Sequence, residues 1–267
     1  MTIDKVSARG GKYFSLCAAL GWIPSITAIN KWGEALDCDS GIATDIWSGA
    51  DGVTSTDVWA PPTQARIHTI ASSDAADTAD GTGLQALRVY YLPDWDSPEQ
   101  VEDVEMNGAG GKTMANPAVV IYRMKGIRWG SGGVNAGIIT ATAATDSTIT
   151  AVVSAGINQT QMAIYAISSN YSIAATRIFS NVIGGTGSGV RLQGQILLME
   201  DPVTYAPDNA AWTEKEGFTV VEDSQPWEAF YDPPKCFTGP CIVKLQLTSD
   251  TNNAKALGGI DGFILKN

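Results

Sequence analysis

Residues 84–92, which read Leu-Gln-Ala-Leu-Arg-Val-Tyr-Tyr-Leu, decide the fold class. Aliphatic, β-branched and aromatic side chains of the kind that strands favour fill this stretch. They lack the sustained 3.6-residue spacing and the capping residues of a helix. Comparable stretches recur to the end of the chain, at 65–71, 101–106, 117–129, 136–143, 148–153, 161–167, 172–182, 190–199, 217–222, 241–249 and 259–266. The sequence therefore predicts an all-β protein.

Turn-forming residues separate these stretches. Clusters of Gly, Pro, Asn, Asp and Ser bound each one, as is usual for strands. Many short strands with frequent turns favour a sandwich or barrel over units in which strands alternate with helices. We therefore predict an antiparallel β-sandwich, jelly-roll-like, over residues 63–267.

Residues 1–62 differ from the rest of the chain, because their periodicity is weak and turn formers recur among them. Four tryptophans nevertheless lie here: Trp22, Trp32, Trp47 and Trp59. Disordered linkers are usually poor in aromatic residues. We expect an extended, irregular N-terminal arm that docks its tryptophans on the chain's own domain or on a neighbouring protein, and we predict these four residues as its anchors.

The composition limits the partners. The chain of 267 residues carries a net charge of -11, and only 17% of its residues are charged. Nucleic acid is not expected as a partner, since phosphate contacts need clustered Lys and Arg. No run of about 18 apolar residues occurs, so no membrane span is expected. The expected partners are proteins, with a basic patch as a complementary surface.

No motif in the sequence predicts catalysis, a cofactor or a metal. The segment 108–113 resembles a phosphate-binding loop, but Met106 stands where that motif needs its first glycine. The one histidine, His68, lies within a strand pattern and is expected to be structural. Acidic residues gather at 74–80 and 94–105 without the spacing of a calcium loop, so we expect solvated loops there. The chain is predicted not to be an enzyme.

Two of the four cysteines lie close together in sequence. Cys236 and Cys241 flank a turn sequence and could form a disulfide across a hairpin. Buried or free thiols are the alternative, and the sequence favours it over the bridge.

Several segments together resemble a family of virion structural proteins of tailed bacteriophages, frequent in marine and cyanobacterial phages. The similar segments keep a shared order and cover most of residues 23–267. They are 23–33, 45–49, 71–83, 130–141, 155–165 and 259–265. The resemblance implies a component of the virion and carries no catalytic residues over to this chain.

Three functions follow as expectations. The first is a decoration or cement protein, expected as a homotrimer, that binds the major capsid protein or other virion proteins and stabilises the head shell. The second is a tail, neck or fibre component that acts in tail assembly or host attachment. The third, from another class, is a carbohydrate-binding or carbohydrate-active module, in which exposed tryptophans stack on sugars and the carboxylates of 94–105 act.

Overall fold

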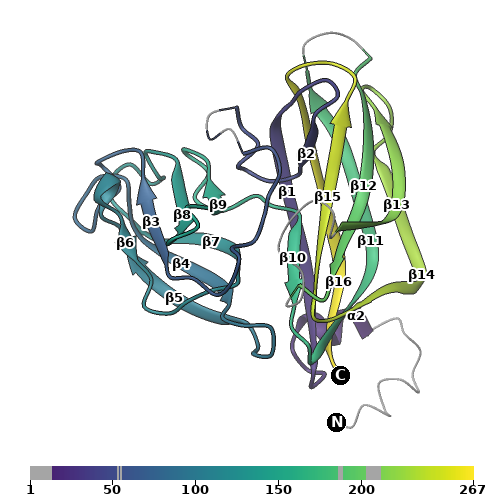
Figure 1. Ribbon diagram of the computed structural model, residues 1–267, viewed down its shortest axis with the longest axis horizontal. Coiled ribbons are helices and arrows are strands. Elements are labelled where there is room, and N and C mark those ends of the chain that lie inside the picture. Colours follow the sequence, from purple (N-terminus) through teal and green to yellow (C-terminus); the bar gives the residue numbers. More distant parts are fainter. Residues whose placement is uncertain (1–13, 53, 55, 186–188, 203–211) are drawn as a thin grey trace.

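The computed structural model describes residues 14–267 except 53, 55, 186–188 and 203–211, and its regular structure is almost all β-strand (Figure 1). Within this described part, helical structure is limited to α2 (Phe14–Ala19) and the 3-10 turn η2 (Gly108–Gly110). Neighbouring strands run antiparallel throughout the four sheets. The prediction of an all-β protein with antiparallel sheets is confirmed. No helix in the described residues is both long and apolar enough to cross a membrane.

The larger of two lobes contains two sheets that lie against one another (Figure 1). The first has the order β1-β16-β11-β14, and the second has the order β10-β15-β12-β13, with the short β2 also on β15. Their bounds are β1 Ile26–Cys38, β2 Ala43–Asp45, β10 Ile164–Ile167, β11 Tyr171–Gly184, β12 Arg191–Glu200, β13 Trp212–Val221, β14 Trp227–Thr238, β15 Cys241–Ser249 and β16 Ala254–Lys266.

The smaller lobe is built from the part of the chain between β2 and β10 (Figure 1). It has a four-stranded sheet, β6-β3-β8-β9, and a three-stranded sheet, β5-β4-β7. The strands are β3 His68–Ser72, β4 Leu84–Leu92, β5 Gln100–Glu105, β6 Lys112–Thr113, β7 Val120–Trp129, β8 Ile139–Ala143 and β9 Ile149–Val153. Four sheets in two lobes are thus present, and together they do not make the single jelly-roll-like sandwich expected over residues 63–267.

Each lobe has a hydrophobic core. The smaller core includes Leu87, Ile121, Met124 and Ile139 between the two sheets of the small lobe. The larger core lies between the two sheets of the large lobe, and residues of the small lobe, among them Leu92, Val119, Val120, Tyr122 and Val152, extend it. The packing is therefore continuous across the junction of the lobes, so side chains at that junction have defined positions.

The expectation of an irregular arm is wrong for residues 26–38. They form β1, which pairs along β16 from Ile26 opposite Leu265 to Cys38 opposite Ala254. Gly33 allows a close approach at the middle of β1, because a Cβ there would lie 2.6 Å from the Cα of Met162. Periodicity is weak because exposed and half-buried residues fill the first half of β1. Residues 1–13 of the expected arm lie outside the described residues.

Strand β14 was also missed, because it contains Pro233 and Pro234. Proline is tolerated on edge strands and at bulges, where no ladder hydrogen bond is lost. β14 is the outer strand of its sheet and pairs only with β11. Its register shifts between Phe230, which lies opposite Arg177, and Lys235, which lies opposite Ala175, so both prolines fall in the irregular part. A strand that bulges around its prolines does not show a continuous β pattern in sequence.

Candidate functional site

Two of the four predicted tryptophan anchors are part of the chain's own core. Trp47 and Trp59 are fully buried. The indole nitrogen of Trp47 donates a hydrogen bond to the carbonyl of Thr56 at 3.0 Å, and that of Trp59 donates to the carbonyl of Thr150 in β9 at 2.8 Å. The prediction that these two anchor the chain on another protein is therefore wrong for the folded chain, because no surface of either is available. Instead, both pack into the chain's own hydrophobic core, and Trp59 also contacts β9 of the small lobe.

The other two tryptophans are exposed. Trp22 lies between α2 and β1 with 66% of its surface accessible, and Trp32 in β1 has 37%. Both can contact a partner, and their role as anchors stays a prediction. Phe230 on the outer strand β14 is 72% exposed and was not singled out from the sequence.

The possible disulfide between Cys236 and Cys241 does not form. Both are free thiols, with Cys236 exposed and Cys241 buried. The turn between them carries the chain from β14 in one sheet to β15 in the other, so the two residues do not face each other across a hairpin. Burial raises the pKa of Cys241 to about 12, which keeps that thiol protonated and a poor nucleophile.

The acidic stretches contain one residue that is not in a solvated loop. Asp94 accepts hydrogen bonds from the backbone N–H of Asp96 and Ser97, at 2.9 and 2.7 Å, within an exposed turn as expected. Asp77 is instead fully buried in the small lobe. The expectation of a solvated loop is wrong for Asp77, because neighbouring backbone N–H groups converge on its carboxylate.

His68 is buried in β3, in agreement with a structural role. Its Nδ1 lies 2.9 Å from the carbonyl of Arg66, and its Nε2 is buried with no hydrogen-bond partner in the described structure. Burial lowers the pKa of this imidazole to about 4, only partly opposed by the Arg66 carbonyl and by Asp146. The ring is therefore neutral at pH 7.

We expect stability to depend on His68 between pH 6.5 and 4. An unfolded histidine takes up its proton near pH 6.5, whereas the folded ring resists protonation to about pH 4. The contribution is present above pH 6.5 and is lost as the pH falls toward 4, by up to about 3 kcal/mol. Urea unfolding of His68→Leu across this range, beside the unchanged chain, measures it. Because this is the only histidine, equal pH slopes for the two proteins would contradict the prediction.

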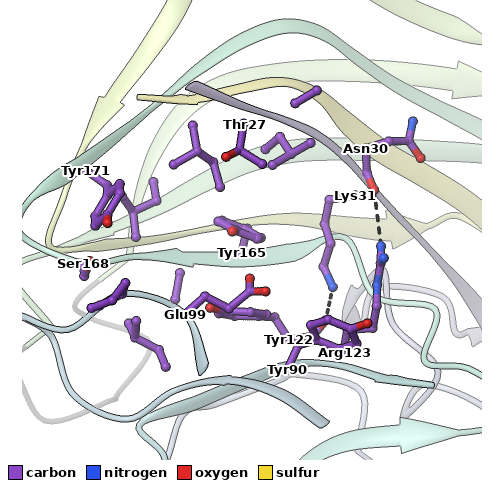
Figure 2. A pocket seen from close by; sticks show the side chains of 17 residues that line it. Thr27, Asn30, Lys31, Tyr90, Glu99, Tyr122, Arg123, Tyr165, Ser168 and Tyr171 are labelled. Carbon is purple, nitrogen blue, oxygen red and sulfur yellow. Dashed lines mark hydrogen bonds between the residues drawn. The ribbon is translucent and has the colours of Figure 1, made fainter. Parts of the chain in front are cut away.

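A cavity lies at the junction of the two lobes (Figure 2). Its volume is about 390 Å³. The large lobe lines it with residues 27–31 of β1, with 165–168 and Tyr171, and with Ile264 of β16. The small lobe supplies Tyr90 and Leu92 of β4, Pro98 and Glu99 from the end of the β4–β5 loop, and Tyr122 and Arg123 of β7. We refer to it as the junction pocket.

Charged groups of opposite sign meet in the junction pocket. Lys31 is only 5% exposed, and its ammonium donates a hydrogen bond to the carbonyl of Tyr122. Burial lowers the pKa of Lys31 well below its usual value, the nearby Arg123 lowers it further, and Glu99 opposes both. Arg123 also donates to the carbonyl of Asn30 at 3.5 Å (Figure 2). The two cations thus bind backbone carbonyls at one side of the pocket.

Glu99 supplies a carboxylate that can accept hydrogen bonds in the pocket. The residue has an exposed surface, but its carboxylate lies among protein groups, and the burial of that carboxylate raises its pKa. Hydrogen bonds from the hydroxyls of Tyr122 and Tyr165, together with Lys31 and Arg123, counteract that rise. The rings of these two tyrosines stack, with centroids 5.0 Å apart. The pocket therefore combines a carboxylate, hydroxyls, a guanidinium and aromatic rings.

Sequence reasoning found only part of this pocket. Glu99 belongs to the acidic stretch 94–105, which was considered for sugar chemistry. Lys31, Tyr122, Arg123 and Tyr165 were not singled out. The one signal that could have drawn notice to Lys31 is that it is the only charged residue of the segment 23–33.

No protein-family model matches the chain, and no curated protein matches it in sequence.

Proposed function

We propose that the chain is a non-catalytic structural protein of a bacteriophage particle, and specifically a capsid-associated decoration protein that forms a homo-oligomer, with a trimer as the expected state. In this proposal it binds the assembled shell, and many identical contacts stabilise that shell by mass action and avidity. The observation that carries the proposal is the strand order of the large lobe.

We also propose that the large lobe is a jelly roll with the small lobe inserted after β2. Eight strands, β1 and β10 to β16, enter into this interpretation. In chain order, the first strand pairs with the last, β1 with β16, and the next pairs follow inward: β10 with β15, β11 with β14, and β12 with β13. Such nested pairing is what a long antiparallel double strand produces when it rolls into two four-stranded sheets. Double-sheet jelly rolls of eight strands are typical of viral capsid domains and also of lectins and cupins.

Because a fold hosts many functions, the surface has to support the assembly role as well. Trp22 and Phe230 are largely exposed, and large aromatic side chains dominate the energetics of protein interfaces. The net charge of -11 favours a partner surface with clustered basic residues. A shell protein with basic patches between its subunits would provide that surface.

The number of copies in purified particles tests this function. Quantitative peptide mass spectrometry, calibrated against the major capsid protein of the same particles, is expected to find this chain in numbers comparable with that protein. A handful of copies per particle would overturn the decoration role and favour a tail, neck or fibre component instead. Absence from purified particles would overturn the virion assignment altogether.

The obvious deletion is not a suitable test. Removal of residues 1–60 would take away β1, β2, Trp47 and Trp59, all of which belong to the fold of the large lobe. Loss of particle binding by such a fragment would report unfolding and not the loss of an anchor.

A further inference from the structure

We infer that the junction pocket binds a neutral sugar residue, such as the terminal unit of a surface glycan. The chain would then recognise a carbohydrate besides any role in a particle. The inference stands on the geometry of the pocket and does not depend on the decoration role.

The size of the pocket fits a small ligand. Ligand pockets in proteins usually measure about 300–1,000 Å³, and the junction pocket, at about 390 Å³, lies near the lower end of that range. One sugar ring with part of its neighbour fills such a space. The walls come from both lobes, so a bound ring would contact residues that are far apart in the sequence.

The polar groups suit hydroxyls, which both donate and accept hydrogen bonds. The carboxylate of Glu99 has about four acceptor sites, and the neighbouring hydroxyls of Tyr122 and Tyr165 lower its pKa. This carboxylate can accept hydrogen bonds from adjacent hydroxyls of a sugar. The guanidinium of Arg123 has five N–H donors, and the lobe junction uses one of them toward Asn30. Donors therefore remain for a ring oxygen or a third hydroxyl.

The apolar part of the lining suits the C–H face of a sugar ring. Tyr90 and Tyr171 are half-buried side chains of the lining. Ile29, Leu92 and Ile264 line the same space. A pocket that is mostly apolar, with a few converging polar groups, is the usual form of a small-molecule site.

The balance of charge argues for a neutral ligand. Glu99 would repel a carboxylate or phosphate, and Lys31 is buried with its ammonium already bound to a carbonyl. Arg123 and Lys31 would in turn repel a cation from Glu99. A neutral ligand with hydroxyls is repelled neither by Glu99 nor by the two cations.

The experiment uses the full chain and a panel of neutral sugars: glucose, galactose, mannose, N-acetylglucosamine and rhamnose. Saturation-transfer NMR is expected to detect binding of at least one of them, and that sugar should raise the melting temperature of the chain. The substitution Glu99→Gln is expected to weaken its binding about tenfold or more, since hydrogen bonds to charged groups contribute most. Arg123→Gln is expected to weaken it as well, as a second variant of the same pocket.

Glu105→Gln is the matched control, because Glu105 is an exposed glutamate of the same lobe that pairs with Arg128 at the surface. This control should bind the sugar like the unchanged chain, and circular dichroism should show that all three variants are folded. No binding of any sugar in the panel would overturn the inference, and so would undiminished binding by folded Glu99→Gln. Glucuronic acid, measured beside the panel, should bind no better than the neutral sugars, and binding of this anionic sugar alone would overturn the assignment of a neutral ligand.

Discussion

The substitution Lys244→Met is expected to lower the free energy of unfolding by about 3–5 kcal/mol, because it leaves a buried carboxylate without its cation. Lys244 and Asp45 are both completely buried, and the ammonium of Lys244 lies 2.6 Å from Oδ2 of Asp45. Burial raises the pKa of Asp45, while Lys244, Gln246 and the backbone N–H of Trp59 favour its charged form. Urea unfolding at pH 7 measures the loss.

The surroundings of this ion pair explain why its loss should affect much of the fold. Asp45 ends the short β2, and its Oδ2 also accepts a hydrogen bond from the backbone N–H of Trp59 at 2.7 Å. Gln246 of β15 donates to Oδ1 at 2.8 Å. Lys244 also lies 4.2 Å from the centre of the Trp212 ring. One carboxylate thus connects β15 to the segment that leads into the small lobe.

Two further variants separate the effect of charge from a loss of packing. Asp45→Asn combined with Lys244→Met keeps an oxygen for the N–H of Trp59 and removes both charges, so it should recover a large part of the stability lost by Lys244→Met alone. Arg88→Met breaks an ion pair of similar length, 2.7 Å to Asp103, in which both side chains are exposed. It should cost far less than Lys244→Met, because ion pairs between exposed side chains contribute little to stability. Equal losses for Lys244→Met and Arg88→Met would contradict the prediction.

The sequence predicts strands whose own residues show a β pattern, among them strands with distant partners such as β16, and misses strands whose pattern is irregular. Residues 84–92 were expected as a strand and form β4 with the same bounds, because this strand packs on the core of its own lobe. β1 does not stand out as a strand in the sequence, because its partner β16 lies more than 200 residues away and its first half is mostly exposed. No local pattern indicates such a pairing.

The candidate site was less predictable than the fold for the same reason. Lys31 and Glu99 belong to different lobes, and they meet only because the small lobe, inserted between β2 and β10, packs back on β1. For the tryptophans, the sequence predicted a binding surface where the structure has buried side chains. Their clustering in residues 22–59 indicated a docking surface, yet the burial of Trp47 and Trp59 depends on β9 and on the large core, which the local sequence does not reveal.

The second large effect is expected for Asp77→Asn, which should destabilise the chain by about 3 kcal/mol. Oδ1 of Asp77 accepts hydrogen bonds from the backbone N–H of Leu84 and Ala136, at 2.7 and 2.9 Å. Oδ2 accepts from the hydroxyl of Ser72 at 2.6 Å and from the backbone N–H of Gly137 at 2.9 Å. Each oxygen therefore accepts from at least one backbone N–H, a group that cannot act as an acceptor. An asparagine would have to point its NH₂ group, which is also a donor, at one of these N–H groups.

The same contacts make the effect of Asp77 depend on pH. Burial alone would raise the pKa of this carboxyl, but the hydrogen bonds from Ser72, Ala136, Gly137 and Leu84 lower it below its usual value. Its contribution is therefore complete above the pKa of an unfolded aspartate, about 3.9, and is lost as the pH falls through the lower folded value. The acid unfolding of the chain should include this loss, and Asp77→Asn should lack it.

Asp80→Asn is the matched control, because Asp80 is an exposed aspartate of the same loop. It should change the free energy of unfolding by no more than about 0.5 kcal/mol. Urea unfolding at pH 7 compares the two variants with the unchanged chain. If Asp77→Asn unfolded at the same urea concentration as Asp80→Asn, the carboxylate would not be what joins residues 72–84 to 136–137. The order of these loops would then have to come from the packing of the small core alone.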